Sequence, residues 1–111
     1  MAASSETPSS AQYQILVSLL SGEKHGYAIM LTVETLTDSK VKLGPGTLYG
    51  AIKRLIEQGW IEESGERPDP SMDDQRRRYY RITVSGKQVT GEETRRLQHV
   101  VGYATQHLFE V

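Results

Sequence analysis

The chain has 111 residues, of which 13 are basic and 14 are acidic, giving a formal net charge of −1. This length fits one domain and leaves no room for a second core. The sequence contains no cysteine, which excludes disulfides, thiol catalysis and thiolate metal sites. Taken alone, the near-neutral total argues against a nucleic-acid-binding domain, because such domains are often strongly basic.

Residues 1–9 are predicted to form a flexible tail. The first ten positions contain no Lys or Arg and no long apolar stretch, so they do not form a secretory signal. The longest apolar run, Tyr27–Leu31, is far shorter than the ~20 residues that span a bilayer. We therefore expect no membrane segment and a cytoplasmic location.

Three helices are expected to follow the tail. Apolar residues recur at helical spacing over 10–20, 27–36 and 47–58. A serine at position 9 or 10 suits the N-cap of the first helix. The third helix has the clearest apolar face; Pro45 fits in or just before its first turn, and Gly59 fits its C-terminal end.

A hairpin and a long helix complete the prediction. Strand-forming residues occupy 60–64 and 76–82, and period two places Tyr80 and Ile82 inward. Thr83 is the expected N-cap of a last helix over 83–111, although two glycines interrupt its early part. The predicted fold class is therefore α+β, mainly α.

The last helix is expected to join two copies of the chain. A domain this small does not cover all the apolar residues of such a helix, and an uncovered stripe on a terminal helix favours a partner helix. A second copy would also add buried area to a short chain. We predict a homodimer with contacts at Val89, Leu97, Val100, Val101, Ala104 and Leu108.

The balanced charge hides two basic windows. Residues 40–54 and 76–87 contain nine of the 13 basic side chains and no acid. Basic patches on a helix and an adjacent hairpin indicate a surface that lies along a duplex. The alternatives stay open: Lys53 and Arg54 alone fit the solvated face of an amphipathic helix, and Asp73 and Asp74 offer part of the counter-charge for the arginine run.

The exposed face of the third helix suits a major groove. Gly50 permits close approach, Thr47 and Tyr49 can contact phosphate or a thymine methyl group, and Lys53 or Arg54 can address guanine or the backbone. The chain has no Asn, and Gln58 lies at the border of this face. Few direct adenine contacts are therefore expected.

Catalytic and cofactor motifs are not recognisable. Gly44, Gly46 and Gly50 miss the dinucleotide spacing G-x-G-x-x-G by one residue. The three histidines form no H-E-x-x-H motif, and there is no G-x-S-x-G elbow. We expect no enzyme activity, no cofactor and no metal site.

Three segments together resemble the PadR family of bacterial transcriptional regulators. They are His25-Gly26-Tyr27, the run GPGTLYGAIKRLIEQGWIEE over 44–63, and the run RRRYYRITVSGKQV over 76–89. The resemblance extends over about residues 11–108, and its length matches the short, single-domain branch. It implies a winged helix-turn-helix over 10–82, a C-terminal dimerisation helix over 83–111, and promoter repression that a small molecule relieves.

Matched residue by residue, Thr47, Tyr49 and Lys53 correspond to the recognition helix of that family. The wing tip differs, because Asp69, Asp73 and Asp74 stand where many relatives have Gly and Arg, which disfavours deep insertion into the minor groove. With the basic windows, the resemblance gives the predicted DNA-binding residues: Lys42, Thr47, Tyr49, Gly50, Lys53, Arg54, Arg77, Arg78 and Tyr79.

The sequence thus predicts a repressor that reads a pseudo-palindromic operator in double-stranded DNA, with half-sites about one helical turn apart. A hydrophobic small-molecule inducer is expected in an apolar pocket at the dimer centre, lined by Tyr13, Val17, Leu97 and Val101. The tryptophan that some short family members place in a drug-binding pore is missing, and Leu97 lies near that position. The alternative function, favoured by the acidic net charge and wing tip, is a winged-helix module that binds a protein partner without DNA.

Overall fold

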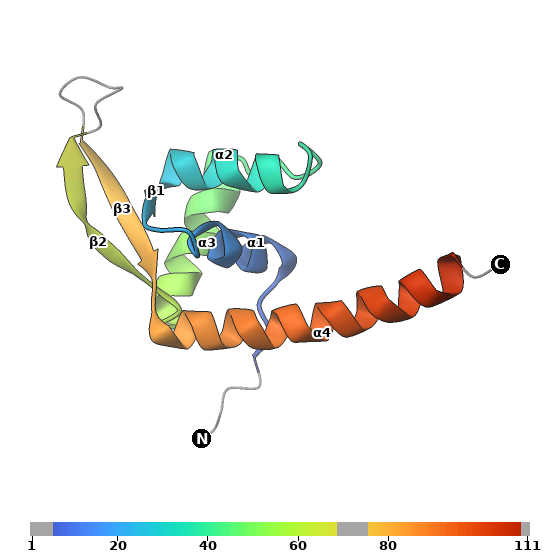
Figure 1. Cartoon of the computed structure of the whole chain (residues 1–111). Coiled ribbons are helices and arrows are strands. Elements are labelled where there is room, and N and C mark those ends of the chain that lie inside the picture. The colour runs from blue at the N-terminus through green and yellow to red at the C-terminus, as the bar shows by residue number, and fades with distance from the viewer. Residues whose placement is uncertain (1–5, 69–75, 110–111) are drawn as a thin grey trace.

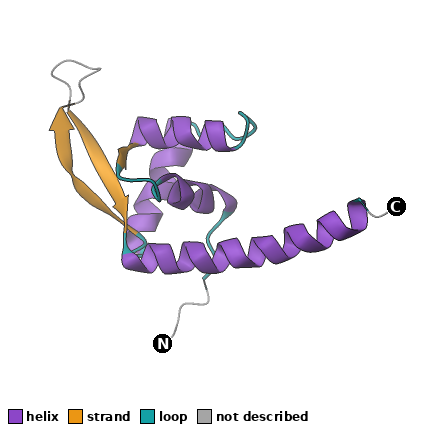
Figure 2. Cartoon of the chain, in the orientation of Figure 1, coloured by secondary structure: helices purple, strands orange, loops and turns teal. Residues whose placement is uncertain are grey.

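The computed structural model describes residues 6–68 and 76–109. Three short helices pack together on one side of a hairpin, and a long helix runs beneath them and projects past their edge (Figure 1). Helices make up most of this fold, and the strands are confined to one side (Figure 2). In chain order the elements are α1 (Ser10–Ser18), β1 (Lys24–His25), α2 (Gly26–Leu36), α3 (Pro45–Glu57), β2 (Ile61–Pro68), β3 (Arg76–Ile82) and α4 (Val84–Leu108).

Local capping explains where the helices begin. Ser9 and Gln12 form a capping box at the start of α1. Pro45 occupies the first turn of α3, where a missing N–H costs no hydrogen bond. The Thr83 side chain accepts from the Gly86 N–H at the start of α4. These three predicted starts are confirmed, whereas the cap of α2 by the His25 ring, which accepts from the Ala28 N–H at 3.1 Å, was not predicted.

The sheet has three antiparallel strands in the order β1-β3-β2. The two-residue strand β1, absent from the prediction, pairs Lys24 with Tyr80 and His25 with Tyr79. In β3 the predicted alternation is confirmed, since Tyr80 is 4% exposed and Ile82 packs against the core. The aspartates predicted for the wing tip, at positions 69, 73 and 74, lie outside the described residues.

The core forms where α1, α2 and α3 meet the base of the hairpin. Ile15, Ile29, Leu55 and Ile61 are essentially inaccessible to solvent. Trp60, directly before β2, is also buried, and its carbonyl oxygen accepts from the Thr83 N–H at the start of α4. The predicted tail also approaches this body: Pro8 is buried, and Ser9 caps α1.

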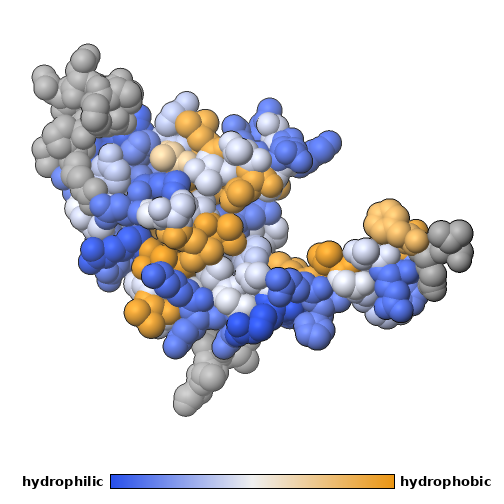
Figure 3. Space-filling view, viewed as in Figure 1, coloured by the Kyte–Doolittle hydropathy of each residue, from blue (hydrophilic) through white to orange (hydrophobic). Residues whose placement is uncertain are grey.

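The long helix α4 is continuous over 25 residues, so the interruption expected at its glycines is wrong. The reason at Gly86 is a close approach: a Cβ at this position would overlap the carbonyl oxygen of Trp60 and the Ile82 side chain. Thr90 and Glu93 continue the buried side of the helix. Beyond Leu97 the helix leaves the body, and its apolar side chains become exposed (Figure 3).

Candidate nucleic-acid interface

The outward face of α3 contains two glycines, Gly46 and Gly50, that no contact among the described residues requires. A Cβ built on Gly46 or Gly50 would have no neighbour within 4 Å. Glycine in a helix interior costs roughly 0.5–1 kcal/mol relative to alanine, so Gly50, in the second turn of α3, loses helix stability without a contact in the described residues to offset it. Lys53 is exposed beside them on a helical wheel. This face is therefore smooth, basic at Lys53 and open to a close-fitting surface.

Tyr49 occupies the edge of α3 that faces α2. Its phenol packs on Gly26, where any Cβ would overlap the Tyr49 hydroxyl group. About half of the tyrosine remains exposed. Tyr49 therefore both fixes the distance between α2 and α3 and presents part of its ring to solvent.

A hollow of about 250 Å³ lies between α3 and the wing, which is the hairpin formed by β2 and β3. Tyr49 lines it from α3, while Arg77 and Arg78 line it from β3. The Arg77 guanidinium also lies 5.4 Å from the centre of the Tyr27 ring, within the range of a cation–π contact. Tyr49 of the first basic window thus lies beside two arginines of the second. The full lining of the hollow is His25, Gly26, Tyr49, Arg77, Arg78 and Tyr80.

Tyr80 closes the inner side of this hollow. Burial raises the pKa of the Tyr80 hydroxyl, and the nearby Tyr49 and Glu63 raise it further. The hydroxyl is therefore neutral at physiological pH. The residue acts as a polar wall beside the arginines and not as a competing anion.

The wing arginines have carboxylate neighbours that the sequence windows did not reveal. Across the hairpin, Arg81 Nε lies 2.6 Å from Glu62, and Arg78 Nε lies 3.5 Å from Glu66 and 3.9 Å from Glu63. These glutamates of β2 supply counter-charge for which Asp73 and Asp74 had been considered. All three pairs are solvent-exposed, so each contributes little to stability and can exchange for another anion.

The remaining predicted DNA contacts lie around α3. Lys42 is exposed in the segment that leads into the helix. Thr47 and Arg54 line a separate hollow of about 510 Å³ on the side facing the start of α1. Gln58 is turned to that side, where its Oε1 accepts from Gln12 Nε2 at 3.2 Å. This contact explains physically why the border amide is not directed to the reading face.

Three of the four predicted ligand-binding residues share one hollow. Tyr13, Val17 and Leu97 line a space of about 520 Å³ between α1, the end of α2 and α4, whereas Val101 is not part of its lining. The Tyr13 hydroxyl and Thr94 Oγ1 lie 2.7 Å apart, which forms a hydrogen bond between α1 and α4. The sequence did not predict the polar end of this space, formed by Glu93 and Arg96.

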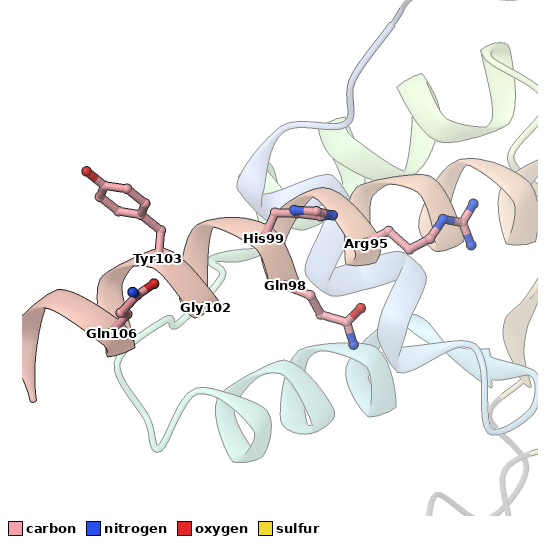
Figure 4. Close-up of a pocket in the computed structure, with 6 residues that line it drawn as sticks. All are labelled: Arg95, Gln98, His99, Gly102, Tyr103 and Gln106. Atoms are coloured by element: carbon pink, nitrogen blue, oxygen red, sulfur yellow. The ribbon is translucent and has the colours of Figure 1, made fainter.

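The predicted dimer residues differ in how far they are exposed along α4. Val89 packs against the core of its own chain. Leu97 and Ala104 are partly buried, and Val100, Val101 and Leu108 are more than half exposed. The opposite side of the helix is polar, with Arg95, Gln98, His99, Gly102, Tyr103 and Gln106 spaced along it (Figure 4). The free half of α4 is thus amphipathic.

Metal-binding groups and membrane-spanning helices also bear on the class of protein. Among the residues that the structure describes, no group of three or more His, Asp or Glu side chains is placed to hold a metal ion. Over the same residues, no helix combines the length and apolar character needed to cross a membrane. A helix-turn-helix followed by a β-hairpin, with a basic smooth helix beside the hairpin, defines a winged-helix protein.

Sequence comparison then identifies the family. A model of the transcriptional regulator PadR-like family matches residues 15–92, and the chain belongs to this family. It is therefore a transcriptional regulator, and the family consists of regulators and not of enzymes. A 37.1 kDa protein in transposon Tn4556 of Streptomyces fradiae is 32% identical over 92 residues. That match includes 83% of this chain, which spans about a quarter of the relative (24%).

Solved structures share the fold. A transcriptional regulator from Clostridium thermocellum is 26% identical with a TM-score of 0.68, covering 90% of this chain and 92% of its own. A PadR family regulator from Clostridium difficile has a TM-score of 0.74 at 24% identity, covering 90% and 99%. Bacillus subtilis PadR, solved in complex with operator DNA, has a TM-score of 0.63 at 24% identity, covering 75% of this chain and 45% of its own. The winged-helix fold with its C-terminal helix is thereby confirmed.

Proposed function

We propose that this protein is a homodimeric repressor that binds a pseudo-palindromic operator through α3 and the wing. Residues 10–82 would form the DNA-binding domain and residues 83–111 the dimerisation helix. The observation that supports this most strongly is the pair of unsupported glycines at positions 46 and 50 on the exposed face of α3. Such a face admits the close approach of a duplex backbone.

Within this proposal, the positions of the basic side chains assign the contacts with DNA. Lys53 lies at the middle of the smooth face, and Arg77 and Arg78 lie across the hollow from Tyr49. Phosphate oxygens can replace the exposed glutamates on Arg78, because both are anionic hydrogen-bond acceptors. Lys42, Thr47, Arg54 and Tyr79 are assigned peripheral contacts with the backbone. Binding to chromosomal DNA would require the protein to work in the cytoplasm.

The proposed dimer uses the exposed apolar side of α4. Leu97, Val101, Ala104 and Leu108 recur at helical spacing on one side of the free half, with Val100 at its flank. Leaving this stripe in water is unfavourable, and pairing with a second copy would remove it. Two α3 helices related by a two-fold axis would then read two half-sites about one helical turn apart. Val89 is assigned mainly to the fold of its own chain.

Release by a small molecule is the regulatory part of the proposal. The hollow beside Tyr13, Val17 and Leu97 lies between α1 of the DNA-binding body and α4 of the dimer. A hydrophobic ligand there would alter the packing of α4 on α1, and so the relative placement of the two recognition helices. Val101, one turn beyond Leu97, would reach the ligand in the dimer.

Binding to DNA fragments selected from the source genome tests the proposal. Affinity is expected to fall steeply as salt rises, because bound phosphates release counterions. Lys53→Ala and Arg77→Ala should each weaken binding and reduce the logarithmic salt slope by about 1. Arg95→Ala removes an exposed charge from the polar side of α4 and is the control. Salt-independent binding, or variants that bind like the wild type, would contradict the proposal.

A second function has one observation in its favour. Glu62, Glu63 and Glu66 offset the wing arginines in the unbound protein, which suits a mixed-charge contact with another protein. In that case the purified protein would ignore DNA, while one protein partner would bind and be lost on substitution of the α3 face. The same Lys53→Ala variant therefore separates the two functions when both kinds of partner are tested.

A further inference from the structure

The hollow between α1 and α4 has an apolar body. Tyr13 and Val17 line it from α1, Leu36 from the end of α2, and Leu97 from α4. Its volume of about 520 Å³ lies within the range of small-molecule sites. A ligand that fills this space would therefore bury mainly hydrocarbon surface.

One end of the hollow contains a nearly buried carboxylate. The side chain of Glu93 is only 8% exposed, and both of its oxygens accept hydrogen bonds from Arg96, at 2.8 and 2.6 Å. These bonds hold the pKa of Glu93 below its ordinary value, so the group is ionised at neutral pH. A carboxylate with so little access to water requires a cation beside it.

The cation that now pairs with Glu93 has solvent on its outer side, into which it can turn. The Arg96 side chain is 57% exposed, and an arginine keeps a favourable hydration when its head swings into water. Arg96 is also outnumbered by acids nearby. A small adjoining hollow of about 110 Å³ is lined by Glu6, Glu92 and Glu93 together with Arg96. The local field therefore favours a second cation over an anion.

We propose that this hollow binds a lipophilic organic cation. The ligand places a protonated amine on Glu93 in place of the Arg96 guanidinium, while its apolar body lies against Tyr13, Val17, Leu36 and Leu97. Arg96 turns outward into solvent. This inference rests on the proposed function only for its consequence, the release of DNA; the binding site itself is defined within one chain.

Calorimetric titration of the full-length protein with three probes tests the charge preference. The probes are 2-naphthylmethylammonium, 2-naphthylmethanol and 2-naphthoate, which share one ring system and differ in the head group. We expect the ammonium to bind about tenfold more tightly than the alcohol, since a hydrogen bond between charged groups is roughly twice as strong as a neutral one. The carboxylate should bind most weakly. Equal affinity for the three probes, or a preference for the carboxylate, would overturn the proposal.

Two substitutions at the ion pair should have opposite effects. Glu93→Gln removes the anion and is expected to abolish the preference for the ammonium probe. Arg96→Gln removes the competing cation and is expected to strengthen ammonium binding several-fold. A pair with a purely structural role would change binding in the same direction in both variants. Arg95→Gln, on the polar side of α4, is the matched control and should leave all three affinities unchanged.

The consequence for DNA is measured separately. Ammonium binding that depends on Glu93 supports the cation site whether or not the protein binds DNA. If the cation binds in this way but leaves an operator complex intact, the release mechanism of the proposed function is wrong and the site remains. If Arg96→Gln folds, as judged by circular dichroism, and does not bind the ammonium more tightly than the wild type, the cation site is wrong.

Discussion

Two glycines inside helices, Gly50 of α3 and Gly86 of α4, have opposite surroundings. A Cβ at Gly86 would overlap the backbone of Trp60, whereas a Cβ at Gly50 would meet nothing within 4 Å. Both positions lose helix stability relative to alanine. At Gly86 the loss is offset by close packing within the chain. At Gly50 the residues that the structure describes offer no such compensation, which is why we assign that glycine to an external partner.

Substitution at the packed glycine gives the largest expected effect. Gly86→Ala forces α4 away from the Trp60 carbonyl and from Ile82, and we expect a loss of about 3 kcal/mol in unfolding free energy. Chemical denaturation followed by Trp60 fluorescence measures it. Gly91→Ala is the control, because its nearest neighbour is the end of the flexible Arg95 side chain, at 3.8 Å. An unchanged midpoint for Gly86→Ala would remove the distinction between the two glycines.

The contact between the start of α4 and the segment after α3 can also be weakened at Thr83, with a smaller expected loss of stability. Its hydroxyl donates to the Gly59 carbonyl oxygen at 2.7 Å and accepts from the Gly86 N–H at 3.0 Å. The Thr83 N–H donates to the Trp60 carbonyl oxygen at 3.0 Å. Thr83→Val keeps the shape and removes both hydroxyl bonds, so we expect a loss of about 2 kcal/mol.

The control for this change is Thr83→Ser, which retains the hydroxyl and should lose much less stability. Thermal unfolding of the three proteins compares them directly. Equal destabilisation by valine and serine would mean that the methyl group contributes as much as the pair of hydrogen bonds, and would contradict the assignment of this contact mainly to the hydroxyl.

Lowering the pH is expected to have a smaller effect on stability, through the Glu93–Arg96 ion pair of α4. Because Arg96 hydrogen bonds lower the pKa of Glu93 in the folded chain, the pair stabilises the protein above the ordinary glutamate pKa of 4.5. That contribution is lost as the pH falls through the lowered folded value. Melting temperatures between pH 7 and pH 3 should therefore decline more steeply for the wild type than for Glu93→Gln. Parallel curves would contradict this assignment.

The parts of this molecule that depend on neighbouring residues in the sequence were predictable. Ser9 and Thr83 cap helices through residues three positions away, and the spacing of apolar residues identified the buried face of α3. In β3, alternation was sufficient to place Tyr80 inside. The resemblance to a known family then supplied the winged helix-turn-helix.

Contacts between distant segments were not predictable from one sequence. The strand β1 exists because His25 and Lys24 pair with β3, and two residues give no alternating pattern. The glutamates opposite Arg78 and Arg81 depend on the register of the hairpin, which includes a bulge between Glu63 and Gly65. At Gly86, the sequence showed a helix-weakening residue but not the Trp60 backbone that requires it.

Gly50→Leu tests most directly whether the open face of α3 fits DNA. Leucine is a good helix former, and its Cβ would have no neighbour within 4 Å among the described residues, so unfolding free energy should stay equal or rise by about 0.5–1 kcal/mol. Affinity for a selected operator should fall by at least ~10-fold, equivalent to about 1.4 kcal/mol. Gly102→Leu, at an open glycine on the polar side of α4, should leave DNA affinity unchanged. Wild-type affinity in Gly50→Leu would contradict the account.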